Sequence, residues 1–527
     1  MTLNAAAVGG PRPRRAEVLA TLSLALDLGL GQPMEHMLRS SIIAARVAGI
    51  LGLDAAQRGV VYYGGLLAWI GCQADSPEVA DLFDDDIAYR AATFEVDLTG
   101  LPLMRLLLGH VGGDQSPGHR VLSQAAFAVR ARAQMTRVIQ SHYASAGSLA
   151  DQLHLGPEVR AAIGYTFERW DGAGLPDGVA GDGIPVEMRV VHVADVAEVL
   201  LREYGTDAAV AMVRKRSGTQ FDPAVADAFV EAAPDLAHDL PVGDAWEAAL
   251  LEAPDRDVTL GPGELDELLV AIADFVDLRS PHRHGHSRRV AELASSAARH
   301  YGLPETEATV LRRAGWVHDV GRLGVSSGVW TKAQPLTATE RERVYLYPHL
   351  TQRIISRVPG LEPVAALAGL HRERLDGSGY PKGADGSFLS ASARILAAAD
   401  AYQSLTEPRG FREALSEEVV ALRLRQEVGA GRLDAVAVET VVYTSRSPSP
   451  RAGVPPGKTS PAGLTTRELE ILRMVAVGRS NREIADELVL SEKTVRNHLE
   501  HIYLKAGVSN RVSASLFALR HGITRAT

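Results

Sequence analysis

Six histidine and aspartate residues in the second half of the chain have the chemistry and the wide spacing of a metal centre. Imidazole and carboxylate ligands bind iron, manganese and similar divalent ions, and the absence of cysteine from the set disfavours a structural zinc site. Such ions lower the pKa of a bound water and hold phosphate oxygens for in-line attack. We expect one or two divalent ions, iron or manganese, held by His286, His318, Asp319, His349, His371 and Asp400.

A glycine-rich loop motif follows His371 and has an echo in the first half of the chain. The echo, residues 171–176, keeps the aspartate, two glycines and the proline but has Leu175 where the motif has tyrosine. A motif that recurs in this way indicates an internal duplication. The residues of the motif are Asp376, Gly377, Gly379, Tyr380 and Pro381.

Two constant shifts align the halves of the first 440 residues. A shift of 250 places His36 on His286 and Ala68-Trp69 on His318-Asp319, without gaps over more than fifty positions. A shift of 205 places Asp171 on Asp376 and Asp195 on Asp400. The change in shift means that the first copy carries about 45 extra residues between Gly71 and Thr166.

The first copy has lost most of its metal-type residues. His36 and Asp195 remain, but Ala68-Trp69 replaces the His-Asp pair, and a catalytic metal needs about three protein ligands plus an open position. We therefore expect a degenerate domain in which Trp69 fills the space of the metal centre. Two roles stay open for it, a scaffold that packs on the second copy and a sensor that binds a small ligand.

The segments that position these residues are predicted to be helices. Residues 267–278, 287–300 and 305–317 carry apolar side chains at helical spacing, and alternating β-branched residues are scarce. Breaks are expected at Gly302–Pro304 and at Pro359–Gly360. The pattern predicts an all-α fold with two helical bundles in tandem.

Residues 266–443 resemble an HD-GYP domain, a branch of the HD phosphohydrolase superfamily. The resemblance implies an HD-domain helical bundle, a centre of two or three metal ions, hydrolysis of cyclic di-GMP, and a substrate pocket beside the glycine-rich loop. It rests on matching motifs at residues 285–290, 318–324, 371–381 and 399–402, together with His349.

Two arginines depart from the HD-GYP pattern. Arg372 stands where the family usually has a second histidine, and Arg322 stands where it has lysine. Charged arginine does not ligate a metal but can pair with phosphate. We therefore expect Arg322 to join His318 and Asp319 as a catalytic residue, while Arg372 puts one metal position in question. His282 and His284, beside His286, are either structural or auxiliary ligands.

Residues 463–527 have the pattern of a helix-turn-helix module. Thr465 and Glu468 form a capping box, Asn481 is expected to cap a second helix, and Ser491 a third. Val495, Leu499 and Ile502 give that third helix a buried stripe, which leaves its polar face for the major groove.

This module resembles the LuxR-type helix-turn-helix family, through motifs at residues 464–468, 478–485 and 491–498. The resemblance implies a small four-helix domain that binds DNA as a homodimer on an inverted repeat. By position, the third helix would read base edges with three residues and hold phosphates with two. The base-reading residues are Arg496, Asn497 and Glu500, and the phosphate contacts are Lys493 and Thr494.

Composition favours a cytoplasmic protein with a nucleic-acid-binding module. The net charge is −9, yet residues 463–527 hold ten Lys/Arg and seven Asp/Glu, a net of +3 that suits nucleic acid. A single cysteine, Cys72, excludes a disulfide within the chain and indicates a reducing compartment. No run reaches about 18 apolar residues, so we predict no membrane span.

The predicted organisation has five parts. We expect a tail (1–16), a degenerate HD-GYP-like domain (17–250), an HD-GYP domain with the metal-type residues (251–444), a Pro/Ser-rich linker (445–462) and the DNA-binding module (463–527). The expected function is a transcriptional regulator whose body binds metal and senses or hydrolyses a cyclic dinucleotide. The alternative is a catalytically inactive body that senses a ligand or dimerises and so controls the DNA-binding module.

Overall fold

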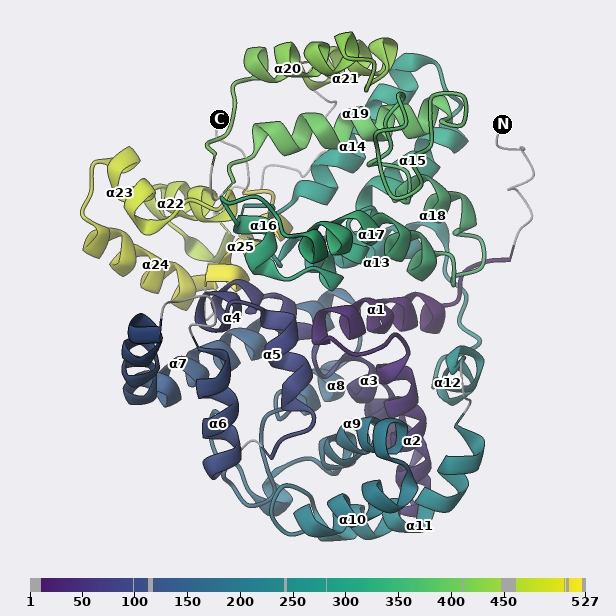
Figure 1. Ribbon diagram of the computed structural model, residues 1–527, viewed down its shortest axis with the longest axis vertical. Helices are drawn as coiled ribbons and strands as arrows, with labels where there is room; N and C mark the ends of the chain where they lie inside the picture. The colour runs from purple at the N-terminus through teal and green to yellow at the C-terminus, as the bar shows by residue number, and fades with distance from the viewer. Residues whose placement is uncertain are drawn as a thin grey trace. The chain divides into compact units, whose positions relative to one another are not determined.

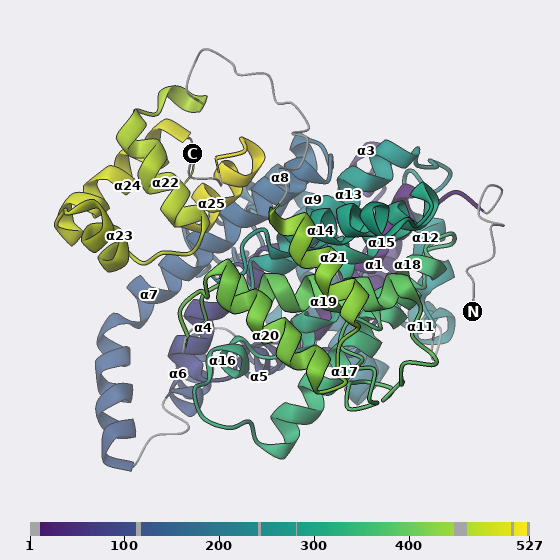
Figure 2. The same cartoon turned by 90° about the horizontal axis from the view of Figure 1, so that it is seen from above.

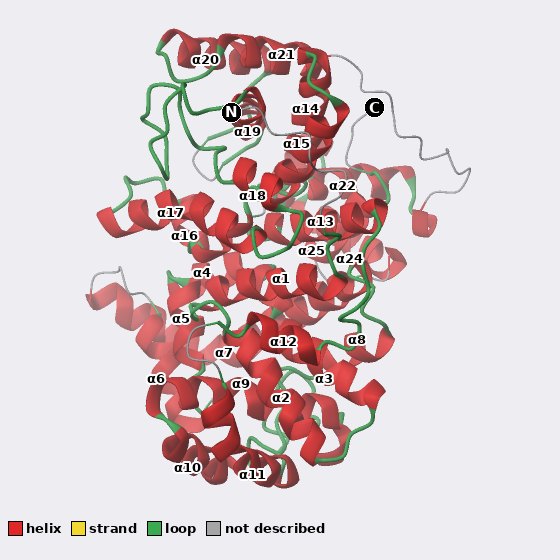
Figure 3. Cartoon of the chain, turned by 90° about the vertical axis from the view of Figure 1, so that its right-hand side faces the viewer, coloured by secondary structure: helices red, strands yellow, loops and turns green. Residues whose placement is uncertain are grey.

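The computed structural model describes residues 11–97, 99–111, 117–240, 244–280, 282–409, 412–446, 461–506, 508 and 511–523. Most of the predicted tail and linker, residues 1–10 and 447–460, therefore lies outside the described residues. The described part contains helices and isolated bridges but no strand, which confirms the all-α fold class (Figure 1, Figure 3). No helix within it is long and apolar enough to cross a membrane.

Contacts divide the chain into two compact units. The N-terminal unit runs from Arg14 to Leu260 and includes Ser326–Gly328, and the C-terminal unit contains Gly261–Val325 and the chain from Val329 onward. The helices of the N-terminal unit are α1 (Arg15–Leu30), α2 (His36–Ile50), α3 (Ala55–Leu67), η1 (Ile70–Gln73), α4 (Ser76–Phe83), α5 (Asp86–Thr93), α6 (Gly100–His110), α7 (Pro117–Gln152), α8 (Pro157–Ile163), η2 (Gly181–Gly183), α9 (Val186–Tyr204), α10 (Thr206–Arg216), α11 (Pro223–Asp239) and α12 (Trp246–Glu252).

The extra residues of the first copy form helices of their own. Helices α4, α5 and α6 and the long α7, which Figure 2 shows along its length, occupy the stretch between Gly71 and Thr166. Phe83, Leu107 and Phe127 pack into a small apolar cluster there. The main core of this unit is separate and packs α2 against α9 and α11, with Val47, Val190 and Phe229 fully buried.

Three packed helices form the frame of the second copy, and the apolar spacing predicts two of them, α14 and α15. Helix α14 packs on both α15 and α19, and a glycine in the left-handed conformation, Gly302, ends α14. The helices of this part are α13 (Pro262–Asp277), α14 (His286–Tyr301), α15 (Glu305–Val317), η3 (Val320–Gly324), α16 (Ser327–Thr331), α17 (Ala338–Ile355), α18 (Glu362–Ala368), α19 (Ala391–Thr406), α20 (Glu417–Gly429) and α21 (Ala435–Arg446).

The C-terminal module has its own apolar core. Ile471, Ile484 and Leu499 are buried in it, each from a different helix. Thr465 and Glu468 form the predicted capping box, whereas Ser480 rather than Asn481 caps the second helix, because Ser480 accepts from the Glu483 backbone. The helices are η4 (Pro461–Gly463), α22 (Thr466–Ala476), α23 (Asn481–Leu488), α24 (Glu492–Ala506) and α25 (Arg511–Arg520).

Candidate metal centre and DNA-binding helix

Four of the expected ligands converge inside the C-terminal unit. His286 begins α14, His318 and Asp319 lie between α15 and η3, and Asp400 lies on α19. All four are at most 1% exposed. His286 Nε2 lies 3.4 Å from Asp400 Oδ1, and His318 Nε2 lies 3.6 Å from Asp319 Oδ1 and 3.8 Å from Asp400 Oδ1. The packing of three helices therefore brings together ligands that are 114 positions apart in the sequence.

The donor atoms at this centre fit a divalent cation. His318 Nδ1 donates to the Gly315 carbonyl at 2.7 Å, which leaves Nε2 as the atom that would bind an ion. Burial opposes the charged form of this ring, but Asp319 and Asp400 raise its pKa in the absence of an ion. His286 is fixed in the same way, since its Nδ1 lies 2.9 Å from Glu407 Oε2. His286 Nε2, His318 Nε2 and Asp319 Oδ1 are buried and have no hydrogen-bond partner. Buried polar atoms need a partner, and an ion between these three would supply it.

Arginines surround both carboxylates of the centre. Arg283, itself buried, pairs with Asp319 Oδ2, and Arg372 Nη1 lies 3.2 Å from Asp400 Oδ2. Burial alone would raise the pKa of Asp319, but the Arg283 guanidinium holds it well below the usual range. Arg372 does the same for the pKa of Asp400. Both carboxylates are therefore ionised, as metal ligands must be.

His371 lies beside the centre, but its lone pair has a partner. Its Nδ1 donates to the Ala368 carbonyl at 2.7 Å, so Nε2 accepts from the Tyr347 hydroxyl at 2.7 Å. The same Nε2 is 3.8 Å from Asp319 Oδ1. The Tyr347 hydroxyl also accepts from Arg372 Nε at 2.8 Å. His371, Tyr347 and Arg372 thus form a hydrogen-bonded group next to the four converging ligands.

His349 is not brought to the centre. It is exposed on α17, and Tyr347, two residues earlier, occupies the buried side of that helix. Two residues correspond to about 200° around a helix, so the two side chains point in nearly opposite directions. Tyr347 also lies 205 positions after His142, the same shift that aligns Asp171 with Asp376. The position that we assigned to His349 therefore belongs to Tyr347.

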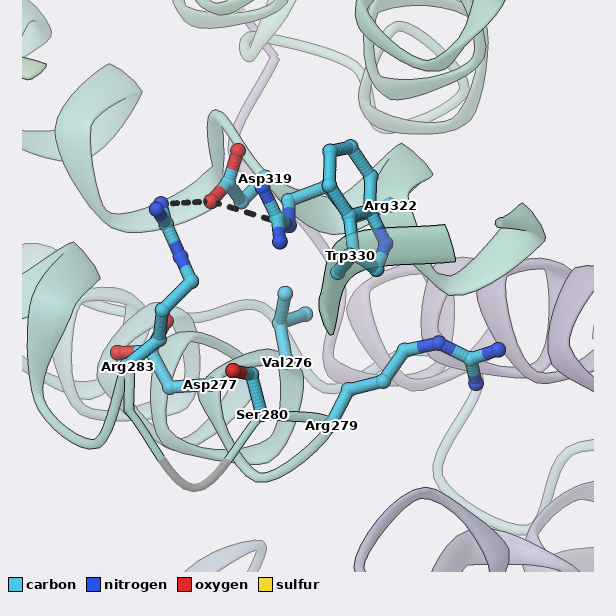
Figure 4. A pocket seen from close by; sticks show the side chains of 8 residues that line it. All are labelled: Val276, Asp277, Arg279, Ser280, Arg283, Asp319, Arg322 and Trp330. Atoms are coloured by element: carbon cyan, nitrogen blue, oxygen red, sulfur yellow. Dashed lines mark hydrogen bonds and ion pairs between the residues drawn. The ribbon is translucent and has the colours of Figure 1, made fainter. Parts of the chain in front are cut away.

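A pocket next to Asp319 is lined by arginine and tryptophan. Arg322 stacks over the Trp330 ring at 3.6 Å from its centroid, and its Nε lies 3.6 Å from Asp319 Oδ2. Figure 4 shows Arg283 and Arg322 turned toward Asp319, while the guanidinium of Arg279 points away. Burial and the neighbouring Arg283 lower the pKa of Arg322 to about 10, so it remains a cation at neutral pH. Sequence reasoning missed Arg283 and Trp330, because neither belongs to a histidine or aspartate pattern.

His284 does not join the metal-type group, although it is buried. Burial lowers its pKa to about 4, and neither of its ring nitrogens has a hydrogen-bond partner. His282 is partly buried, and the pKa of its ring is lowered for the same reason. Neither residue joins the metal-type group, so the role of this pair, structural or auxiliary, stays a prediction.

The glycine-rich loop has the same framework in both copies. In the second copy, Glu373 accepts from the backbone of Lys382 and Ala384, each at 2.8 Å. In the first, Glu168 accepts from the backbone of Asp177 and Val179, each at 3.0 Å. A side chain at Gly379 or at Gly174 would overlap the backbone next to that glutamate, which explains the glycine. The framework is therefore common to both segments.

The remaining loop residues shape and flank the turn. Asp376 accepts from the Ser378 backbone at 3.0 Å, next to Gly377, which takes a left-handed conformation. Tyr380, which precedes Pro381, stacks on the exposed ring of Tyr345, with centroids 4.5 Å apart and planes 10° apart. Tyr380 of the loop therefore forms a stacked pair with Tyr345 of α17. The first copy has Leu175 in place of Tyr380 and so lacks this aromatic ring.

In the first copy, protein groups satisfy the one remaining aspartate of the old centre. Trp69 Nε1 donates to Asp195 Oδ2 at 3.1 Å, and His36 Nε2 lies 3.2 Å from Asp195 Oδ1. His36 Nδ1 lies 2.5 Å from Glu198 Oε2. Burial would lower the pKa of His36, but Glu198 and Asp195 raise it to about 10. The charge of an imidazolium thus stands where the second copy presents histidine lone pairs.

The expected DNA-reading residues share one exposed face of α24. Lys493, Arg496, Asn497 and Glu500 are exposed, and Thr494 is half-buried. Ser491 caps the helix by accepting from the Thr494 backbone at 3.0 Å. Val495, Leu499 and Ile502 lie in the core, as their spacing predicts. The polar residues are therefore available to a partner.

Two protein families match this chain. The HD domain family matches residues 128–225 and 271–436, which together make up half of the chain. The family of bacterial regulatory proteins called the luxR family matches residues 462–518.

Several curated relatives are phosphodiesterases of cyclic dinucleotides. The chain is 28% identical over 404 residues to 3′3′-cGAMP-specific phosphodiesterase 3 of Vibrio cholerae, with 76% of this chain and 88% of that protein covered. It is 34% identical over 187 residues to 3′3′-cGAMP-specific phosphodiesterase 1 of the same organism, covering 36% and 43%. A cyclic di-GMP phosphodiesterase of Thermotoga maritima is 30% identical over 155 residues, covering 28% and 42%. The chain thus spans less than half of the latter two proteins.

A solved structure has a similar fold. The crystal structure of a cyclic GMP-AMP specific phosphodiesterase from V. cholerae superposes with a TM-score of 0.58 at 23% identity, covering 83% of this chain and 99% of that one. The family matches and this superposition agree on an HD-domain helical fold. The chain belongs to the HD domain family and carries a C-terminal DNA-binding domain of the luxR family.

Proposed function

We propose that the C-terminal unit hydrolyses a phosphodiester bond of a cyclic dinucleotide, with a divalent ion held by His286, His318, Asp319 and Asp400. The observation that carries this proposal is the convergence of two histidine lone pairs and a carboxylate oxygen, all buried and unpartnered. When bound, iron or manganese would activate a water and neutralise charge on the phosphate. The names of the relatives supply the substrate class.

In this proposal, arginines hold the phosphate. Arg283 and Arg322 line the pocket beside Asp319, and guanidinium groups match the geometry of phosphate oxygens. Trp330 fixes the plane of Arg322 by stacking on it. The free space in this pocket is about 10 Å³, room for about one water or ion, so a single phosphate oxygen would enter it, and the rest of the phosphate and the bases would remain outside.

Stacked aromatic rings suit the bases. The exposed Tyr345 stacks on the partly buried Tyr380, and Tyr347, which bonds His371, lies 6.5 Å from Tyr380 between ring centroids. Nucleobases stack on such rings with little sequence preference. We assign Tyr345 and Tyr380 to base binding, with Asp376, Gly377, Gly379 and Pro381 as the frame of the loop.

Arg372 supports a centre of one ion rather than two. Its guanidinium is paired with Asp400 and Tyr347, so a positive charge already lies where a second histidine would provide a ligand. A second cation there would meet direct repulsion. We therefore propose one ion per chain at this centre.

The same arginines favour a second candidate function, a sensor without turnover. Arg283 and Arg372 each pair with one of the two carboxylates, and these ion pairs compete with a metal for the ligands. In that case the pocket would bind a cyclic dinucleotide and alter DNA binding without cleaving the ligand.

The DNA-binding domain gives the output in both cases. We propose that α24 enters the major groove, that Arg496, Asn497 and Glu500 contact base edges, and that Lys493 and Thr494 contact phosphates. The protein would act as a homodimer on an inverted repeat, in the cytoplasm, where its DNA lies.

One experiment separates the two candidates. The purified full chain is loaded with Mn²⁺ or Fe²⁺, its metal content is measured, and 3′3′-cGAMP and cyclic di-GMP are supplied as substrates. We expect a linear product in the wild type and none in the double variant His318→Ala with Asp319→Ala. His349→Ala, an exposed histidine of the same unit, is the matched control and should keep full activity. Ligand binding without any linear product would establish the sensor instead.

A further inference from the structure

A second group of metal-type side chains lies in the N-terminal unit, beside residues that align with the first centre. Cys72 lies on η1, Asp75 directly precedes α4, and His142 lies on α7. One ligand atom of each residue lies within 4.8 Å of the others. The three residues, which we call the Cys72 cluster, are 0–3% exposed. Thiol, carboxyl and imidazole groups are thus collected in one buried place.

The orientation of His142 points to a missing cation. Its Nε2 lies 3.2 Å from the Ala68 carbonyl, which can only accept, so Nε2 carries the proton and Nδ1 carries a lone pair. That Nδ1 is fully buried, has no hydrogen-bond partner, and lies 4.0 Å from Asp75 Oδ2. Two acceptors therefore face each other with no proton between them. Metal-binding histidines are commonly held by such a bond from the other ring nitrogen to a carbonyl.

The backbone brings these elements unusually close. A Cβ atom at Gly71 would overlap both the carbonyl and the ring of His142, so only glycine lets η1 approach α7. The second copy has the same approach, where Gly321 meets the Tyr347 carbonyl. The place of His142 is therefore a property of the shared fold, but the ligand set is not. The shift of 250 aligns Cys72 with Arg322 and Asp75 with Val325, neither of which binds a metal.

Buried charged groups adjoin the cluster. Asp75 pairs with Arg90, whose other nitrogen lies 3.6 Å from Asp86, and all three are buried. The cluster itself holds the Asp75 carboxylate and the Cys72 thiol. A divalent ion would neutralise this carboxylate together with the thiolate that forms on binding.

We propose that Cys72, Asp75 and His142 bind a zinc ion. Thiolate, imidazole and carboxylate are the three ligand types that zinc takes in proteins, and a thiolate is a poor ligand for magnesium or calcium. Binding replaces the thiol proton by a zinc–sulfur bond and releases that proton to solvent. The ion would connect η1, the segment that precedes α4, and α7. Its site is separate from the proposed hydrolytic centre.

Cobalt spectroscopy tests this proposal, because Cys72 is the only cysteine of the chain. The full chain is produced in medium supplemented with Co²⁺, so that the ion is present while the buried site folds, and a thiol-free reductant is used throughout. Any thiolate-to-cobalt charge-transfer band must then come from Cys72. We expect this band in the wild type, and we expect Zn²⁺ to abolish it when Zn²⁺ replaces Co²⁺ in the medium.

Variants separate the two metal sites. The band should persist in the His318→Ala, Asp319→Ala double variant, which keeps the Cys72 cluster. It should vanish in Cys72→Ser, and the metal content of Cys72→Ser should fall by one ion per chain. Wild-type protein that carries cobalt but lacks the band would overturn the proposal, whatever the variants do. A band that disappears with the double variant would overturn it as well, since the thiolate would then depend on the other centre.

Discussion

Replacing Arg372 by methionine should lower the stability of the metal-free protein and raise its affinity for metal. Arg372 pairs with the fully buried Asp400 at 3.2 Å and donates to Tyr347 at 2.8 Å, while its own side chain is 17% exposed. Removing one partner of such a buried pair costs about 3–5 kcal/mol, because a carboxylate is left without a counter-charge. Methionine fills a similar length without charge. We expect the free energy of unfolding of the C-terminal unit to fall by about 3 kcal/mol when metal is removed by a chelator.

A bound ion would supply the counter-charge that Arg372 provides in its absence. The loss of stability should therefore shrink when Mn²⁺ is added, and the same free energy should reappear as tighter binding. A difference of about 3 kcal/mol corresponds to about a hundredfold in the dissociation constant. Denaturant unfolding with and without chelator would measure the change in the free energy of unfolding. Titration calorimetry would measure the change in the dissociation constant of Mn²⁺.

The control for this prediction is Arg425→Met in the same unit. Arg425 pairs with Glu439 at 2.7 Å, but both side chains are more than half exposed. Exposed ion pairs are screened by water and contribute little to stability, so this variant should bind Mn²⁺ like the wild type. If Arg372→Met left both the chelated stability and the Mn²⁺ affinity unchanged, Arg372 would not take the place of a cation, and our account of the centre would fail.

Three further predictions concern other parts of the molecule. Arg496→Ala should weaken binding to a specific DNA site by about 1–3 kcal/mol, the range for a lost base contact, and equal affinity in a salt-controlled shift assay would refute that role. Ile484→Ala should lower the free energy of unfolding of the C-terminal module by about 2–5 kcal/mol, because its side chain is fully buried in that core; circular dichroism during thermal unfolding would measure it. Burial lowers the pKa of His192 to about 4, below its unfolded value of about 6.5, so unfolding takes up a proton. The N-terminal unit should lose stability as the pH falls from about 6.5 to 4, and His192→Gln should flatten that dependence in denaturant titrations.

The sequence by itself determined the features that depend on local chemistry. Helical spacing of apolar residues located α13 to α15. The capping box of Thr465 and Glu468 located the start of α22, because in such a box two side chains three residues apart each accept a hydrogen bond from the other residue's backbone N–H. Two constant shifts predicted an internal duplication, since a repeat persists in residue order. The buried stripe of Val495, Leu499 and Ile502 also followed from spacing alone, and so did the exposed polar face of α24.

Tertiary structure decided which side chains meet. Helical register turned Tyr347 inward and His349 outward, a difference of two residues that a motif search did not resolve. The pairing of Arg372 with Asp400 joins a loop to α19, and that of Arg283 with Asp319 joins two other segments. The Cys72 cluster needed η1 to approach α7 across seventy residues of chain, through the space left by Gly71. These contacts arise from the packing of helices that are distant in sequence, so no local pattern contains them.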